Sequence, residues 1–156
     1  MKVSGLPLPA TTTRVEQATA REINARIQRA TAESLRRVAA GGSPAIARRL
    51  EELDREWDVE RTLEANAATV TLVALGLGFA VSRRWFIFPV VIAAFLLQHT
   101  LQGWCPPLPI FRRRGIRTER EINLERTALR ILRGDFRSPT DDPGEALRLA
   151  KEAEPL

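Results

Sequence analysis

The chain has 156 residues, of which 44% are hydrophobic and 28% charged, and its formal net charge is +5. Its one cysteine and one histidine exclude a disulfide framework and a metal centre built from several Cys and His ligands. The length suffices for one soluble domain, or for less once membrane segments are subtracted. The charges are absent from most of one central block. The sequence therefore indicates where the protein resides more clearly than what chemistry it performs.

The N-terminal arm is expected to span residues 13–64, after a disordered segment of residues 1–12 that is rich in Pro and Thr. Thr13 and Glu16 have the spacing of a capping box, which predicts a helix from there to residue 40. The pair Gly41-Gly42 is expected to end this helix.

A second helix of this arm is predicted to begin with Ser43 as its cap and Pro44 at its first position. Its apolar residues recur at helical spacing on one face: Ile46, Leu50, Leu53 and Trp57. Such a face predicts packing against a partner, for example a second copy of the chain. We expect this helix to continue unbroken into the first apolar segment.

Two charge-free segments follow, residues 65–82 and residues 85–111, and only Arg83 and Arg84 separate them. A helix of 18 residues is roughly 27 Å long, close to the hydrocarbon thickness of about 30 Å. Prolines at 106, 107 and 109 should end the second helix near residue 105. The short connection predicts a transmembrane hairpin with spans at 65–82 and 85–105. A hairpin buried in a soluble bundle is the alternative, but residues 90–97 are apolar on all sides.

The arginine distribution predicts the orientation of this hairpin. Arginines precede the first span and follow the second more densely than they occupy the connecting turn: Arg48, Arg49, Arg55 and Arg61 before it, and Arg112, Arg113, Arg114, Arg117 and Arg120 after it. The positive-inside rule then places both termini in the cytoplasm and the turn outside a bacterial inner membrane.

The C-terminal tail, residues 112–156, is expected to be basic and helical. Thr118 and Glu121 form a second capping-box pattern, and the helix they begin should end at Gly134. Its apolar residues Ile122, Leu129 and Leu132 share one face. Asp142 and Pro143 predict a last short helix. The fold class is therefore all-α: a two-helix transmembrane hairpin (65–111) with amphipathic helical cytoplasmic arms.

The end of the second span, LLQHTLQGWCP at residues 96–106, resembles the YgaP-like inner-membrane domain family, a two-helix module of unknown function. The matching residues are Leu96, Leu97, Gln98, Gly103, Cys105 and Pro106, with Trp104 in the aromatic position. The chain departs from the family pattern at Phe95, His99, Leu101 and Gln102. The resemblance covers residues 60–116 and implies a membrane hairpin that self-associates as a dimer. Because the chain lacks the rhodanese domain found in some members, it implies no sulfurtransferase activity.

Cys105 is the candidate functional thiol. At a cytoplasmic interface it could receive sulfur or sense oxidants, with the nearby arginines activating it. The simpler interpretation, which we favour, is a small side chain packed against the neighbouring helix.

Four polar residues are candidates for intramembrane contacts: Asn66, Gln98, His99 and Gln102. Gln98 and Gln102 share a face and could hydrogen-bond to Asn66, Thr69 or Thr71 of the first span, or to a second protomer, as polar residues do between membrane helices. A role in conducting a solute is the alternative for His99.

Arg112, Arg113 and Arg114 are expected to bind lipid headgroups or to act as a topological stop signal. Nucleic acid is not an expected partner, because acidic residues are interleaved with the basic ones throughout both arms. No catalytic set, metal site or cofactor motif is recognised.

The sequence thus predicts a small, non-enzymatic interaction or scaffolding module of the inner membrane. Its expected partners are the lipid bilayer, a second copy of the chain and an unidentified membrane or cytoplasmic protein. A conduit for a small solute or a sulfur species, with Cys105 as its interfacial thiol, is the alternative function.

Overall fold

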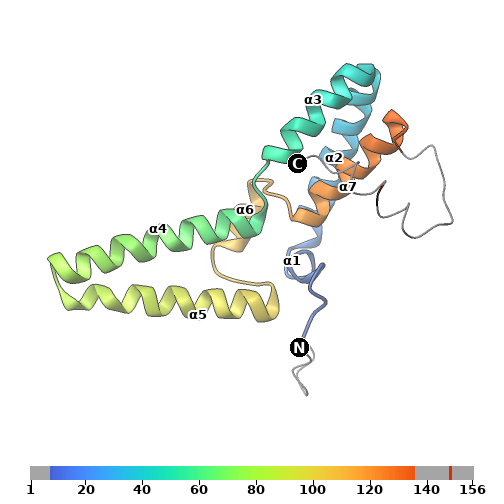
Figure 1. Cartoon of the computed structure of the whole chain (residues 1–156). Coiled ribbons are helices and arrows are strands. Elements are labelled where there is room, and N and C mark those ends of the chain that lie inside the picture. Colours follow the sequence, from blue (N-terminus) through green and yellow to red (C-terminus); the bar gives the residue numbers. More distant parts are fainter. Residues whose placement is uncertain (1–7, 136–147, 149–156) are drawn as a thin grey trace.

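The computed structural model describes residues 8–135 and Arg148, and the regular elements within residues 8–135 are all helices. They are α1 (Arg14–Gln17), α2 (Arg21–Ala40), α3 (Gly42–Arg55), α4 (Val59–Ala80), η1 (Arg83–Phe86), α5 (Ile87–Gln102), α6 (Leu108–Arg113) and α7 (Glu119–Arg133). The α4 and α5 helices run side by side in opposite directions and extend away from α2, α3 and α7 (Figure 1). The all-α prediction is confirmed for the described residues.

The helices α2, α3 and α7 contact one another pairwise and form a three-helix bundle. Its buried residues are Ile46, Leu50, Leu53, Ile122 and Leu129, with Leu35 and Val38 packed against them. The apolar face of α3, which we expected to meet a partner, is therefore covered by α7 of the same chain. The N-terminal and C-terminal arms are not separate, because they share this core.

Two members of the predicted apolar faces lie outside this core. The Trp57 side chain is half exposed, and the guanidinium of Arg61 lies 4.4 Å from the centre of its ring. Leu132, near the end of α7, is also exposed. The helical periodicity therefore identified the buried faces of α3 and α7 but extended each of them too far at its C-terminal end.

An ionic cluster lies between the helices of the bundle and centres on the fully buried Glu125. Arg49 donates to its two carboxylate oxygens over 3.0 and 3.1 Å, and Arg117 donates over 2.5 Å. Ser34 of α2 adds a hydrogen bond of 2.8 Å. Burial alone would raise the pKa of Glu125, but these hydrogen bonds outweigh it and hold the pKa below its ordinary value.

The N-terminal helix begins differently from the prediction. Thr13 makes no side-chain cap bond, and its hydroxyl instead accepts a 2.9 Å hydrogen bond from the Gln17 amide. The helix then breaks after Gln17 and resumes at Arg21. The predicted capping box is thus wrong, and the break turns α1 toward the end of α5.

The junctions around α3 also differ from the prediction. The helix begins at Gly42, one residue before the expected cap Ser43, and Ser43 makes no cap bond. It ends at Arg55, so it does not continue into α4. Asp58 caps α4 by accepting a hydrogen bond from the Arg61 amide, and the Val59 amide donates to the Arg117 carbonyl over 2.9 Å. This break lets α3 fold back against α7.

The predicted limits of α7 are confirmed. Thr118 and Glu121 form a complete capping box, and Gly134 ends the helix with a φ of 90°. The expected helix at Asp142 and Pro143 and most of the N-terminal segment (residues 1–7) lie outside the described residues.

Two helical stretches are long and apolar enough to cross a membrane: the one that ends with α4 at Ala80, and Arg83–Gln102, which comprises η1 and α5. We call α4 and η1–α5 the apolar pair. Gly78 permits close packing within it, since a Cβ there would lie 2.6 Å from the Phe86 ring. Most other large side chains of the pair are exposed: Val70, Leu72, Val73, Phe79, Val81, Ile87, Val90 and Leu97 are at least half exposed.

Candidate functional site

The site lies where the apolar pair meets the rest of the chain, at the C-terminal end of α5. Gly103 ends this helix in the left-handed conformation, with a φ of 73°, and its amide donates to the His99 carbonyl over 2.7 Å. A side chain at this position would overlap the backbone of Arg14, because a Cβ would lie 2.5 Å from the carbonyl carbon and oxygen. Glycine is therefore required for α1 to pack directly on the turn that leads to Cys105.

Three charged or polar side chains contact one another in a row across this junction. Arg14 of α1 donates to one carboxylate oxygen of Glu60 over 2.8 Å, and the other oxygen lies 2.9 Å from Nε2 of His99. His99 is only 2% exposed, although it belongs to an apolar helix. The carboxylate thus supplies the partner that a buried imidazole requires.

The second ring nitrogen of His99, Nδ1, is buried and has no geometrically satisfactory hydrogen bond. The Cys105 thiol lies close enough to the ring to interact with it electrostatically. Because Nε2 faces Glu60, Nδ1 is the nitrogen that remains for the thiol. The order Glu60, His99, Cys105 places a carboxylate, an imidazole and a sulfur nucleophile in sequence, which is the arrangement of activated cysteines.

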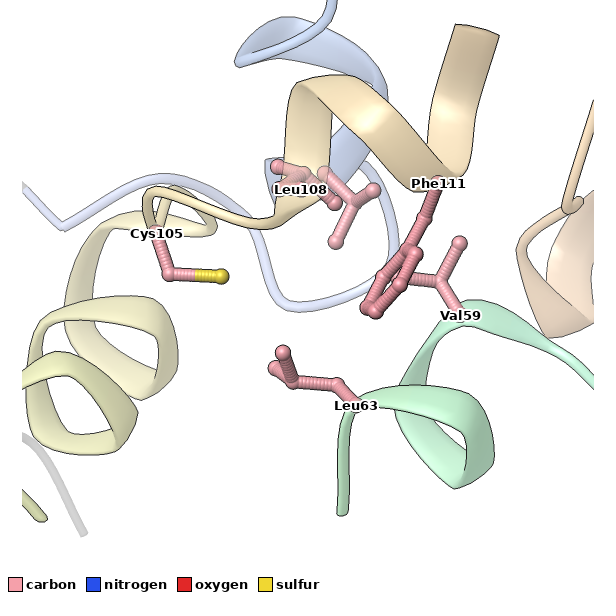
Figure 2. Packing of buried hydrophobic residues seen from close by; sticks show 6 residues of the cluster. Val59, Leu63, Cys105, Leu108 and Phe111 are labelled. Atoms are coloured by element: carbon pink, nitrogen blue, oxygen red, sulfur yellow. The ribbon is translucent and has the colours of Figure 1, made fainter. Parts of the chain in front are cut away.

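The thiol belongs to a small apolar cluster, which we call the junction core. It consists of Val15, Val59, Leu63, Cys105, Leu108 and Phe111. In Figure 2 the Cys105 side chain points from its loop toward the other labelled residues of the cluster. With 1% exposure, Cys105 is packed as the simpler sequence interpretation proposed, although its partners come from several elements and not from one helix.

A cavity of about 330 Å³ adjoins the thiol between α4 and α5. It is lined by Leu63, Asn66, Ala67, Val70, Ile92, Phe95, Leu96, Cys105, Pro107 and Phe111. From Leu63 to Val70 the lining follows α4 for seven residues, or roughly 10 Å at the helical rise. The cavity therefore extends from Cys105 along the apolar pair, away from the three-helix bundle.

The other predicted polar contacts of the pair do not form as expected. The Asn66 amide donates to the Thr62 carbonyl over 2.7 Å, and the Thr69 hydroxyl donates to the Ala65 carbonyl over 2.7 Å. Both bonds lie within α4, so neither side chain meets Gln98 or Gln102. Gln102 is exposed and Gln98 partly exposed, and His99 alone of these candidates forms a polar contact between the two helices.

Arg112 has a structural role that excludes the predicted contact with lipid headgroups. Its side chain is fully buried and its guanidinium donates five hydrogen bonds. Two go to the Glu121 carboxylate over 2.7 Å, and the others go to Thr19, Asn24 and the Ile116 carbonyl. All five donors are thus satisfied inside the protein. Arg113 and Arg114 are exposed, and for these two residues the contact with lipid headgroups stays a prediction.

Glu60 and Arg14 were missed from the sequence because both lie outside the charge-free segments. A usable signal was present, however. Glu60 lies near the start of α4 and His99 near the end of α5, and in antiparallel helices these ends are neighbours. No signal of this kind was available for Arg14, whose position depends on the break between α1 and α2.

No family model, no curated protein and no solved structure matches the chain. The resemblance to the YgaP-like domain family therefore rests on the motif at residues 96–106 alone. Within residues 8–135, no group of three or more Asp, Glu, His or Cys side chains is arranged to hold a metal ion.

Proposed function

We propose that the chain is a non-enzymatic membrane module of the bacterial inner membrane. In this proposal the apolar pair crosses the bilayer as a hairpin, and the three-helix bundle is a cytoplasmic platform for a protein partner. The observation that carries it is the exposure of large apolar side chains around both helices of the pair. In water, exposed apolar surface of this extent is a strong liability, whereas in lipid it is the surface required.

The distribution of polarity along the molecule supports this arrangement. The ends of α4 and α5 that meet the bundle carry Glu60 and His99, whose side chains form a hydrogen bond with each other. The opposite end carries Arg83 and Arg84, and both are exposed. From residue 65 to residue 82 and from residue 85 to residue 102 the pair has no Asp, Glu, Lys or Arg. About 18 residues of α4 and a similar length of η1–α5 therefore suit a hydrocarbon core of about 30 Å.

We propose that self-association uses the lipid-facing surface of the pair. The α3 face is already covered by α7, and therefore no longer supports a dimer through the bundle. Crosslinking in native membranes is expected to yield a dimer, and monomers alone would contradict this part of the proposal.

The same geometry favours the non-enzymatic membrane module over a conduit for a solute. A conduit would require Gln98, His99 and Gln102 to face one path through the pair. Neither glutamine lines the cavity beside Cys105, and His99 is paired with Glu60.

Two exposed leucines provide a matched test of membrane insertion. Leu72 in the middle of α4 is 69% exposed and Leu124 on α7 is 67% exposed. If α4 lies in lipid, Leu72→Arg should impair insertion at a cost of about 2.5–3.5 kcal/mol, whereas Leu124→Arg should be tolerated. The measurement is the fraction of protein retained in vesicles after an alkaline carbonate wash. Equal retention of both variants, or release of the unmodified chain, would contradict the proposal.

The orientation is tested separately with reporters. A periplasmic reporter inserted between Arg83 and Arg84 should be active, and the same reporter fused to either terminus should be silent. The reverse pattern would place the three-helix bundle on the periplasmic side of the membrane.

A further inference from the structure

We infer that Cys105 is an S-acylation site, at which the thiol accepts a long acyl chain from an acyl thioester. The acyl chain would occupy the cavity between α4 and α5, and His99 would act as the base that takes the thiol proton. This inference rests on the proposed membrane location of the apolar pair.

The shape and chemistry of the cavity indicate the class of ligand. Apart from the thiol, Asn66 is the one polar side chain among its lining residues, and the others are aliphatic, aromatic or proline. It begins at Cys105, beside the bundle, and continues between the helices toward the middle of the proposed spans. A thioester carbonyl at the bilayer surface with its chain directed into the hydrocarbon has the same orientation.

The histidine supplies an independent reason to expect a reaction at this thiol. A buried polar atom without a partner is rare and calls for an explanation. With the Nε2–H of His99 donating to Glu60, Nδ1 is the ring nitrogen left without a hydrogen-bond partner, and the Cys105 thiol interacts with the same ring. Glu60 therefore acts as a positioning residue, which fixes the tautomer and the ring orientation, and Arg14 holds Glu60 in turn.

The proposed step is a thioester exchange without any change of oxidation state. Nδ1 of His99 takes the proton of the Cys105 thiol while Sγ attacks the carbonyl carbon of the acyl thioester. The new Sγ–C bond replaces the C–S bond to the leaving thiol, and the proton passes from His99 to that leaving sulfur. The products are acylated Cys105 and one free thiol, so atoms and protons balance.

The burial of Cys105 restricts which electrophiles can reach it. Because the residue is 1% exposed, a hydrophilic reagent has no direct approach from water. Cys105 is one of the lining residues of the apolar cavity, so the proposed approach of the thioester is from that side. A long-chain thioester should therefore react faster than a short-chain one, which gains little from the cavity.

The test uses the full chain reconstituted in vesicles of phosphatidylethanolamine and phosphatidylglycerol. Palmitoyl-CoA or acetyl-CoA is added, and intact mass spectrometry before and after neutral hydroxylamine measures thioester formation. One palmitoyl group per chain is expected, with none on Cys105→Ser. His99→Gln should lower the initial rate by roughly 100-fold, as loss of a general base does. Palmitoylation of Cys105→Ser, or no modification of the unmodified chain, would overturn the inference.

A matched pair of variants tests the role of the cavity. Ala67→Phe fills the cavity and should slow palmitoylation without slowing acetylation, whereas Ala68→Phe, on the neighbouring exposed position, should change neither. Equal effects of the two variants would refute the assignment of the acyl chain to this cavity. Circular dichroism of each variant identifies any that fails to fold.

The role of the His99 ring as a base has its own test. Imidazole added to His99→Ala should restore part of the palmitoylation rate.

The carbonate wash, applied to the same vesicles, separates this inference from the proposed function. Protein that resists the wash but is not acylated would refute the acylation site alone. Protein that is washed off would refute the membrane location first.

Discussion

Replacing Gly103 by alanine tests how closely α1 is held against the end of α5. The substitution has two costs. The left-handed backbone, with a φ of 73°, costs an L-residue about 1–2 kcal/mol. In addition, the new Cβ would lie 2.5 Å from the Arg14 backbone, which cannot move without shifting α1. Overpacking of this kind adds about 1–3 kcal/mol, so we expect a total loss of roughly 2–5 kcal/mol.

Two other glycines separate these costs. Gly115 has a φ of 86° but no atom within 4 Å of its Cβ position, so Gly115→Ala should cost the backbone term of about 1–2 kcal/mol alone. Gly76 lies inside α4 with the same open surroundings, so Gly76→Ala should be neutral or slightly stabilising. Thermal unfolding of the full chain in detergent micelles should order the losses as Gly103, then Gly115, then Gly76. If Gly103→Ala and Gly115→Ala unfold at the same temperature, the proposed contact between α1 and the turn is wrong.

The three-helix bundle gives three further predictions. Glu125→Gln should cost about 3–5 kcal/mol because it removes the buried carboxylate that Arg49 and Arg117 share and leaves them only partly exposed carboxylates as partners. Asp135→Asn, at an exposed pair, should cost about 0–1 kcal/mol, and urea unfolding measures both. The pKa of Glu121, which burial would raise, is instead held below its ordinary 4.5 by Arg112, and that of Glu125 is lowered similarly. Stability should therefore be complete above about pH 4.5 and fall as the pH drops toward the folded-state pKa values; unfolding curves that are unchanged down to pH 3 would contradict this. Leu53→Ala in the core should cost about 2–5 kcal/mol, and Leu132→Ala, on the surface, less than about 0.5 kcal/mol by the same measurement.

The local features of the chain were predictable where a few neighbouring residues decide the outcome. The capping box of Thr118 and Glu121 forms as expected, because both partners lie within one helical turn. The apolar face of α3 was identified from its spacing. The capping box at Thr13 failed, however, because α1 has tertiary contacts with Glu60 and Gly103 that a four-residue pattern does not contain.

Composition and periodicity alone determined that the chain is helical, that two helices are apolar enough for a bilayer, and where α7 begins and ends. These properties depend on residues within one or two turns of each other. Only the tertiary structure decided that the two arms share one core, that Arg112 is buried and that Glu60 pairs with His99. Each of these contacts joins residues far apart in the sequence, and the spacing of side chains along one helix carries no information about which other helix will cover it.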